Sequence, residues 1–66
     1  VMEDLMDPSE AARALGIELA TVYTWVARRK IPFVKVGSAL RFRPSALQDW
    51  LREREYSPKQ SGELQG

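Results

Sequence analysis

The sequence predicts one small domain that is mostly α-helical and carries a single β-hairpin. Three observations lead to this fold class. The 66 residues are 44% hydrophobic, enough for one core but not for two. Three segments repeat apolar residues at helical spacing, and a short segment between the second and the third alternates polar and apolar residues around Gly37.

The first helix is expected to begin at Pro8. Asp7 can cap the first free N–H groups, Pro8 suits the first helical position, and Glu10 stands where a capping box places its carboxylate. Gly16 tolerates the left-handed conformation that ends a helix. The inner side of this helix is expected to carry Ala11, Ala12 and Leu15.

The second helix is expected to run from about Leu19 to Arg29, and Pro32 would close it. Its apolar stripe, at spacing i, i+3, i+4 and i+7, comprises Val22, Trp25, Val26 and Arg29. The opposite face is expected to be open to solvent or to a partner, and it carries Ala20, Tyr23, Thr24, Ala27 and Arg28.

A hairpin follows, with strands expected over 33–36 and 40–43 and a turn at 37–39, where Gly37 supplies a positive φ. The period of two is expected to place Val34 and Val36 on one face with Leu40 and Phe42 across the hairpin. Lys35 and Arg41 would then share the other, exposed face.

Pro44 opens a third helix, which is expected to reach about Arg54 or Glu55 and to bury Leu47, Trp50 and Leu51. The chain beyond it is polar and has a single aliphatic residue, so it cannot bury enough surface to order itself. We therefore expect a domain over residues 5–55 and a flexible tail or linker over 56–66.

Cysteine and histidine are both absent, which removes thiolate nucleophiles, imidazole acid–base chemistry and the usual zinc ligands. We expect no enzyme activity from this chain by itself, no cofactor and no metal. The first residues are acidic rather than basic, and no apolar run approaches the roughly 20 residues of a membrane span. A cytoplasmic protein without a membrane partner is the expectation.

The net charge of +1 conceals a segregated pattern. Between Leu19 and Gln48 there are no acidic residues and six basic ones, hence +6, whereas the two flanks together carry −5. The six are Arg28, Arg29, Lys30, Lys35, Arg41 and Arg43. Clustered cations gain affinity by releasing counterions from a phosphate backbone, so a polyanionic partner is indicated; a merely solvated basic face is the alternative.

The spacing of Ala12, Gly16 and Val22 carries the functional argument. Two helices that meet steeply across a short turn need a small side chain at the contact, a residue that tolerates positive φ, and an apolar anchor on the second helix. This is the geometry of a helix-turn-helix, whose second helix can enter the major groove of DNA. A hairpin directly after that helix stands where the winged variant carries its wing.

At these positions the sequence resembles the excisionase-like and MerR-like helix-turn-helix domains, over about Leu5 to Arg52. The resemblance lies in Ser9-Glu10-Ala11-Ala12, Leu15-Gly16-Ile17, Thr21-Val22-Tyr23-Thr24-Trp25, Ile31-Pro32, Lys35-Val36-Gly37, Arg41-Phe42 and Ser45-Ala46-Leu47-Gln48-Asp49-Trp50-Leu51. It implies sequence-specific binding of double-stranded DNA, with the second helix in the major groove and the hairpin over 33–42 on the backbone or in the minor groove. By the same analogy the DNA contacts are Thr21, Tyr23, Thr24 and Arg28 from the helix and Lys35, Ser38 and Arg41 from the wing.

The chain departs from these domains at two places. Many of them begin the recognition helix with Ser followed by Arg or Lys, where this chain has Glu18-Leu19-Ala20. Their wing tip is often a basic residue followed by an aromatic one, here Ala39-Leu40. Both differences remove DNA contacts, so we expect a modest binder that acts through self-association, several copies or a partner protein such as a recombinase.

Two other hypotheses stay open. The first is a protein-interaction domain of the same fold that no longer binds DNA and uses the apolar surface of Leu19, Ala20, Ala39 and Leu40. The second is the DNA-binding end of a longer regulator, recombinase or transposase. Trp25 and Trp50 are expected in the core rather than stacked on bases, because both lie on apolar stripes.

Overall fold

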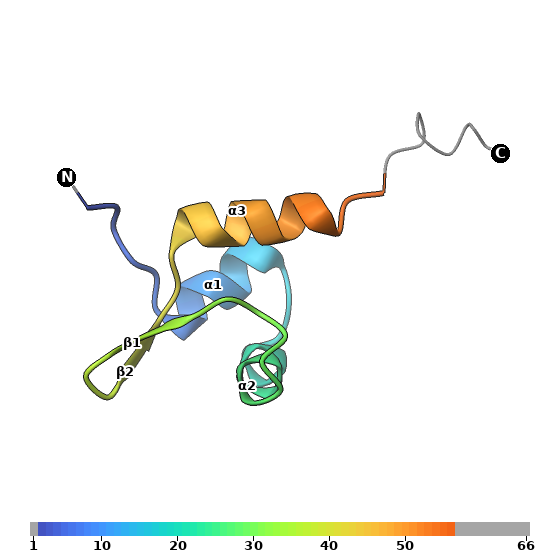
Figure 1. Ribbon diagram of the computed structural model, residues 1–66. Coiled ribbons are helices and arrows are strands. Elements are labelled where there is room, and N and C mark those ends of the chain that lie inside the picture. The colour runs from blue at the N-terminus through green and yellow to red at the C-terminus, as the bar shows by residue number, and fades with distance from the viewer. Residues whose placement is uncertain (1, 57–66) are drawn as a thin grey trace, which may run out of the picture.

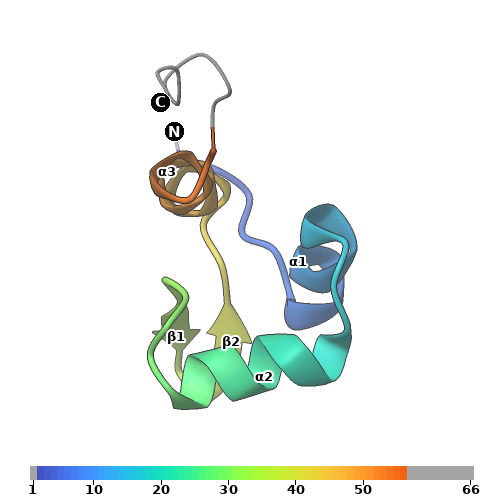
Figure 2. The ribbon, with the colours of Figure 1, turned by 90° about the vertical axis from the view of Figure 1, so that its right-hand side faces the viewer.

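The computed structural model describes residues 2–56 and confirms the predicted fold class. The elements follow in the order α1 (Pro8–Leu15), α2 (Leu19–Ala27), β1 (Val34–Val36), β2 (Ala39–Arg41) and α3 (Pro44–Glu53). In Figure 1, α3 lies at the top of the molecule, α2 and the hairpin lie at the bottom, and α1 lies between them. In the perpendicular view of Figure 2, α2 and the two strands again lie together, away from α3.

The start of α1 has the predicted capping box. The Asp7 side chain accepts a hydrogen bond from the Glu10 N–H at 2.8 Å, and the Glu10 carboxylate accepts one from the Asp7 N–H at 2.9 Å. Pro8 occupies the first turn, where its missing N–H costs nothing. The cap therefore fixes where α1 begins.

The turn between α1 and α2 is built as the Ala12, Gly16 and Val22 spacing predicts. Gly16 is left-handed, with φ 70°, and the N–H groups of Gly16 and Ile17 reach back to the carbonyls of Arg13 and Ala12. α1 and α2 pack against each other, with Ala12 6% exposed and Val22 fully buried. The small side chain lets the two helices approach, and the left-handed residue turns the chain between them.

The prediction that α2 runs to Arg29 is wrong, because the helix ends at Ala27 and Arg29 adopts a left-handed conformation with φ 58°. Its N–H donates to the Val26 carbonyl at 3.0 Å, and the N–H of Lys30 donates to the Trp25 carbonyl at 2.8 Å. This is the same closing motif that Gly16 completes in α1. Arg29 is exposed rather than part of the inner stripe, and Pro32 follows a helix that has already ended.

The hairpin has a two-residue loop, Gly37-Ser38; β1 begins one residue later than predicted, and β2 begins one residue earlier and ends two residues earlier. Its partners are Val34 with Arg41, Lys35 with Leu40, and Val36 with Ala39. Paired residues lie on the same face, so the predicted faces are wrong: Lys35 shares its face with Leu40, and Arg41 shares its face with Val34 and Val36. The shortened loop changes the register by one residue, and each such slip moves side chains to the opposite face.

The core lies between α1, α2, α3 and β2. Its buried residues are Ala11, Ala12, Val22, Ile31, Phe42 and Leu47. Phe42, which is fully buried, also forms a bridge to the chain before α1: the N–H of Met6 donates to its carbonyl at 2.8 Å, and its own N–H donates to the Met6 carbonyl at 2.9 Å. The segment leading into α1 is thereby paired with the residue that follows β2.

α3 is shorter and less buried than predicted. It ends at Glu53, and Leu51 is 46% exposed because only Leu47 and Trp50 turn toward the rest of the molecule. Trp50 is half-buried, and its indole N–H donates to the Lys30 carbonyl at 2.9 Å. The ring also meets Trp25, with centroids 5.7 Å apart, so both tryptophans pack beside the core as predicted.

The start of α3 is capped from a distance by Glu3. Its carboxylate accepts hydrogen bonds from the Ser45 N–H at 3.0 Å and the Ser45 hydroxyl at 2.7 Å, and it pairs with Arg43 at 3.4 Å. These donors stabilise the charged form, so the two hydrogen bonds from Ser45, followed by the charge of Arg43, hold the pKa of Glu3 below its usual value.

Among residues 2–56, no helix is long and apolar enough to cross a membrane. The predicted tail over 56–66 lies, except for Tyr56, outside the described residues.

Substituting Arg29→Gly is expected to stabilise the domain. The left-handed conformation costs a residue with a Cβ about 1 kcal/mol and costs glycine almost nothing. For a domain of this size, that relief corresponds to a rise in Tm of about 4–8 °C by thermal unfolding. Arg28, with φ −92°, is the matched control: Arg28→Gly should lower Tm, and a fall with both variants would contradict the strain at Arg29.

Glu3→Gln is expected to weaken the fold at neutral pH and to change its acid response. Because the pKa of Glu3 is lowered by folding, its carboxylate stabilises the native state at pH values above the usual glutamate pKa, and this contribution is lost as the pH falls through the lowered pKa. Urea unfolding at several pH values should show the wild type and the variant converging below about pH 4. Glu55 is exposed, and Glu55→Gln is the control: its free energy of unfolding should match that of the wild type at each pH. If Glu3→Gln is less stable than the wild type by the same amount at every pH, the assignment is contradicted.

Candidate nucleic-acid interface

α2 turns one side toward the core and presents the other to solvent. Val22 is buried, and Trp25 and Val26 are packed beside the core. The outward residues of α2 are all exposed, as predicted, and we call them the recognition face: Ala20, Tyr23, Thr24, Ala27 and Arg28. α2 lies on the side of the molecule away from α3 (Figures 1 and 2), and its exposed face is open to a large partner.

The side chains of the recognition face differ in what they can offer. Tyr23 is 51% exposed, so its ring and hydroxyl can both reach a partner. The Thr24 hydroxyl donates its hydrogen to the Ala20 carbonyl at 3.0 Å, which leaves its oxygen as an acceptor and its methyl group as an apolar contact. Thr21, a predicted contact, is half-buried at the edge of this face.

The three predicted contacts of the hairpin are not equivalent. Lys35 and Ser38 are exposed, and Lys35 lies on the face of the hairpin that also carries Leu40, which packs against the core. Arg41 lies on the other face and is half-buried, with a guanidinium N–H donating to the Leu40 carbonyl at 2.7 Å. Lys35 and Arg41 therefore cannot present their charges from one side of the hairpin, as the sequence analysis expected.

The predicted basic segment is divided by the fold. Arg28, Arg29 and Lys30 are consecutive and exposed where α2 ends, and Lys35 is exposed on β1. Arg43, at the start of α3, is instead paired with the Glu3 carboxylate at 3.4 Å. The recognition face and the end of α2 consequently carry positive charge with no acidic residue between 19 and 48 to compensate it.

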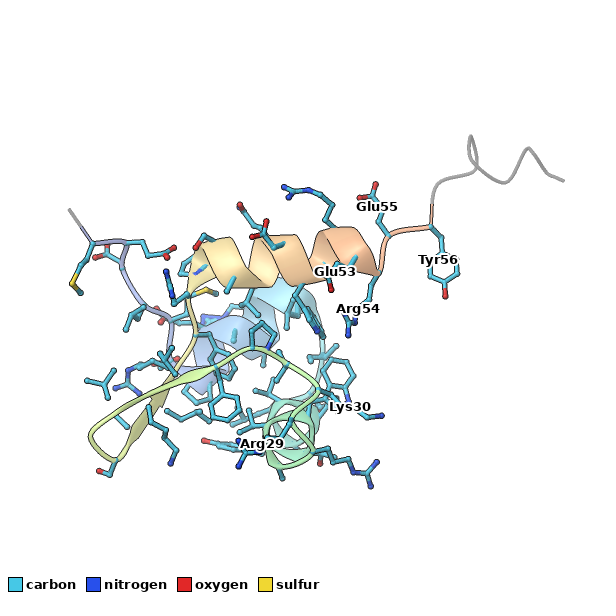
Figure 3. All side chains as sticks on the ribbon, in the orientation of Figure 1. Arg29, Lys30, Glu53, Arg54, Glu55 and Tyr56 are labelled. Carbon is cyan, nitrogen blue, oxygen red and sulfur yellow. The ribbon has the colours of Figure 1, made fainter. Side chains whose placement is uncertain are left out.

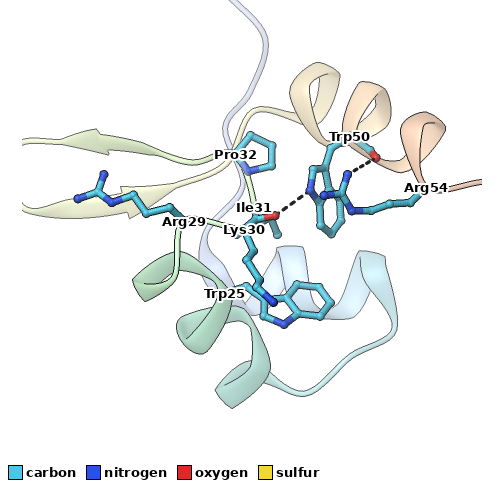
Figure 4. Close-up of a pocket in the computed structure, with 7 residues that line it drawn as sticks. All are labelled: Trp25, Arg29, Lys30, Ile31, Pro32, Trp50 and Arg54. Carbon is cyan, nitrogen blue, oxygen red and sulfur yellow. Dashed lines mark hydrogen bonds between the residues drawn. The ribbon is translucent and has the colours of Figure 1, made fainter.

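An open groove of about 750 Å³ separates the end of α2 from α3. Its two tryptophans are each accompanied by a cation: the Arg54 guanidinium lies 4.4 Å from the centre of the Trp50 ring, and Figure 4 shows the Lys30 side chain directed toward Trp25. Arg54 is also bonded to the Trp50 carbonyl at 3.1 Å and lies 3.6 Å from Glu53. A cation over a tryptophan ring is a favourable packing contact. We therefore interpret the residues of this groove as part of the packing of α3.

Two of the important residues were not identified from the sequence. Arg29 was predicted as the last residue of the second helix and of its apolar stripe, and nothing in the sequence marks a non-glycine residue as left-handed. Glu3 lies 42 residues from Ser45, so its hydrogen bonds depend on tertiary structure alone. Within residues 2–56 there is no group of three or more His, Cys, Asp or Glu side chains that could hold a metal ion.

Comparison with known protein families matches residues 5–55 to the family described as helix-turn-helix domain. Searches of curated proteins and of solved structures gave no significant match. The matched range contains the capped α1, the turn at Gly16, α2, the hairpin and α3, and DNA binding is the function of this architecture. The chain belongs to the helix-turn-helix domain family and has the winged form of its fold.

Proposed function

We propose that the chain is a sequence-specific binder of double-stranded DNA that acts as a small regulatory or recombination-accessory protein of the excisionase-like kind. The observation that carries the proposal is the exposed recognition face of α2, which continues into three consecutive cations and lies beside the hairpin. Binding and positioning are the proposed activity, without bond-breaking chemistry by this chain itself.

In this proposal α2 enters the major groove. The groove is about 12 Å wide, and a helix with its side chains is about 10–12 Å across, so an unobstructed helix face fits it. Thr21, Tyr23 and Thr24 would contact base edges. With its hydrogen bonded to Ala20, the Thr24 oxygen suits a donor such as the amino group of cytosine or adenine, and its methyl group suits that of thymine.

The phosphate backbone would be held from the end of α2 and from the hairpin. Arg28 lies at the end of the recognition face, and Lys35 and Ser38 are exposed on the hairpin. Arg41 would join them through the guanidinium N–H groups that its hydrogen bond to the Leu40 carbonyl leaves unused. Such contacts position a protein on the duplex without reading its sequence.

The proposed interface has few cations that can contact phosphates, so we expect a single domain to bind DNA with modest affinity. Self-association, several adjacent copies, or a partner such as a recombinase would raise it by making later binding events intramolecular. The same expectation holds if the chain is the DNA-binding end of a longer regulator.

The alternative of a protein-interaction domain has less support. Of its four proposed apolar residues, Leu40 packs against the core and Ala39 is half-buried. Leu19, 39% exposed, and Ala20 remain, and together they make a small apolar surface. Such a surface would not require the cations that follow α2.

Arg28→Ala is expected to weaken binding to every duplex sequence by a similar factor. Removing one phosphate contact should reduce the slope of log K against log salt concentration by about one. Fluorescence anisotropy with labelled duplexes at several salt concentrations measures both effects. Arg52, paired with Asp49 at 2.9 Å on α3, provides the control Arg52→Gln, which should change neither affinity nor slope.

Equal slopes for the wild type and Arg28→Ala would remove Arg28 from the interface. Wild-type protein that fails to bind any duplex at low salt would contradict the proposed function itself.

A further inference from the structure

The two helices of the helix-turn-helix end in the same way but with different residues. In α1 the left-handed position is Gly16, and in α2 it is Arg29, each with the following residue bonded back to a carbonyl of the last turn. Glycine occupies this position without steric cost, whereas arginine brings a Cβ into the disfavoured region. The fold would accept glycine at both places, so the arginine is not required by the backbone.

No side-chain hydrogen bond or ion pair of Arg29 within residues 2–56 offsets the cost of this conformation. The Arg29 side chain is exposed and takes part in none of the hydrogen bonds or ion pairs of the described chain. The backbone carbonyl of Lys30 accepts a hydrogen bond from the Trp50 indole, and the Arg54 guanidinium is held over the Trp50 ring. The guanidinium of Arg29 is therefore available to a partner.

The direction of the Arg29 side chain shows which part of the surface it lies on. Figure 4 shows Arg29 extending toward the two strands, away from Trp50 and Arg54, and Figure 3 places it beside the end of α2. Lys35 lies on the core-side face of the hairpin, and Arg28 immediately precedes Arg29. Exposed cations therefore stand both at the end of α2 and on β1, and Arg29 lies between these two elements in the chain.

We infer that Arg29 binds a DNA phosphate, from its position in the segment between the recognition helix and the wing. The inference rests on the proposed function and adds to it a contact that the family resemblance does not assign, at one of the six cations of the basic segment. A guanidinium donates two parallel hydrogen bonds to phosphate oxygens, which fixes orientation as well as supplying charge. A phosphate held there would set the angle at which α2 enters the groove relative to the hairpin.

The competing explanation is structural: the positive charge of Arg29 would stabilise the negative, C-terminal end of the α2 dipole. Arg28 and Lys30 already place two cations at that end, so Arg29 adds little there. The two explanations also differ in outcome, because a dipole contribution affects folding stability, whereas a phosphate contact affects the salt dependence of DNA binding.

The test uses Arg29→Asn and Arg29→Lys in the full chain, with salt-dependent anisotropy on the duplexes used for Arg28. Asparagine tolerates the left-handed conformation and has no charge, so the fold is kept while the contact is lost. We expect about tenfold weaker binding and a slope smaller by about one for Arg29→Asn. Arg29→Lys should keep the slope and lose part of the affinity, because its ammonium cannot bind bidentately.

Thermal unfolding of both variants checks that the fold is intact, and Arg52→Gln again serves as the unaffected control. Unchanged slope and affinity for Arg29→Asn, with a weakened Arg28→Ala, would overturn the contact at Arg29 and leave the proposed function standing. Loss of affinity with an unchanged slope would also overturn it, since a phosphate contact must appear in the salt dependence. Absence of duplex binding by the wild type would instead contradict the proposed function.

Discussion

The packing of α1 against α2 is the contact on which the rest of this domain depends. Ala12 is small enough for the helices to approach, Val22 is fully buried at the crossing, and the left-handed Gly16 reverses the chain within a few residues. A larger side chain at Ala12 would separate the helices, since interiors at this packing density have no spare volume. With the crossing fixed, the recognition face of α2 necessarily points away from α1 and α3.

The acidic and the basic side chains have different roles in this molecule. The carboxylates of Asp7 and Glu10 cap α1, and that of Glu3 caps α3. Acidic groups near a helix N-terminus meet unpaired N–H groups and the positive end of the dipole, so their placement stabilises the fold. The cations at the end of α2 and on β1 form no ion pair within residues 2–56 and lie exposed at the surface that the proposed function requires.

Local signals in the sequence predicted local structure accurately. The Asp7-Pro8 start of α1, the left-handed Gly16 and the Pro44 start of α3 are all present, because caps and turns depend on neighbouring residues. Predictions failed where a single residue decided between alternatives. A loop one residue shorter than expected separated Lys35 from Arg41, and Arg29 ended α2 although a periodic pattern continued through it.

The candidate site was predictable only where it depends on local sequence patterns. Exposure of Tyr23, Thr24 and Arg28 follows from helical periodicity once Val22 is buried. The unequal positions of Lys35 and Arg41 follow from hairpin register, which depends on the turn. The cap from Glu3 and the bridge between Met6 and Phe42 join residues far apart in sequence, and no local pattern encodes them.

The central claim is that the recognition face of α2 and the adjacent hairpin form one DNA-binding surface. An NMR titration of labelled protein with a short mixed-sequence duplex at low salt tests it residue by residue. The account predicts amide shift changes over residues 20–29 and 35–38, with little change over 45–52 of α3. Shift changes confined to α3 and Arg54, or none on adding a stoichiometric excess of duplex, would contradict it.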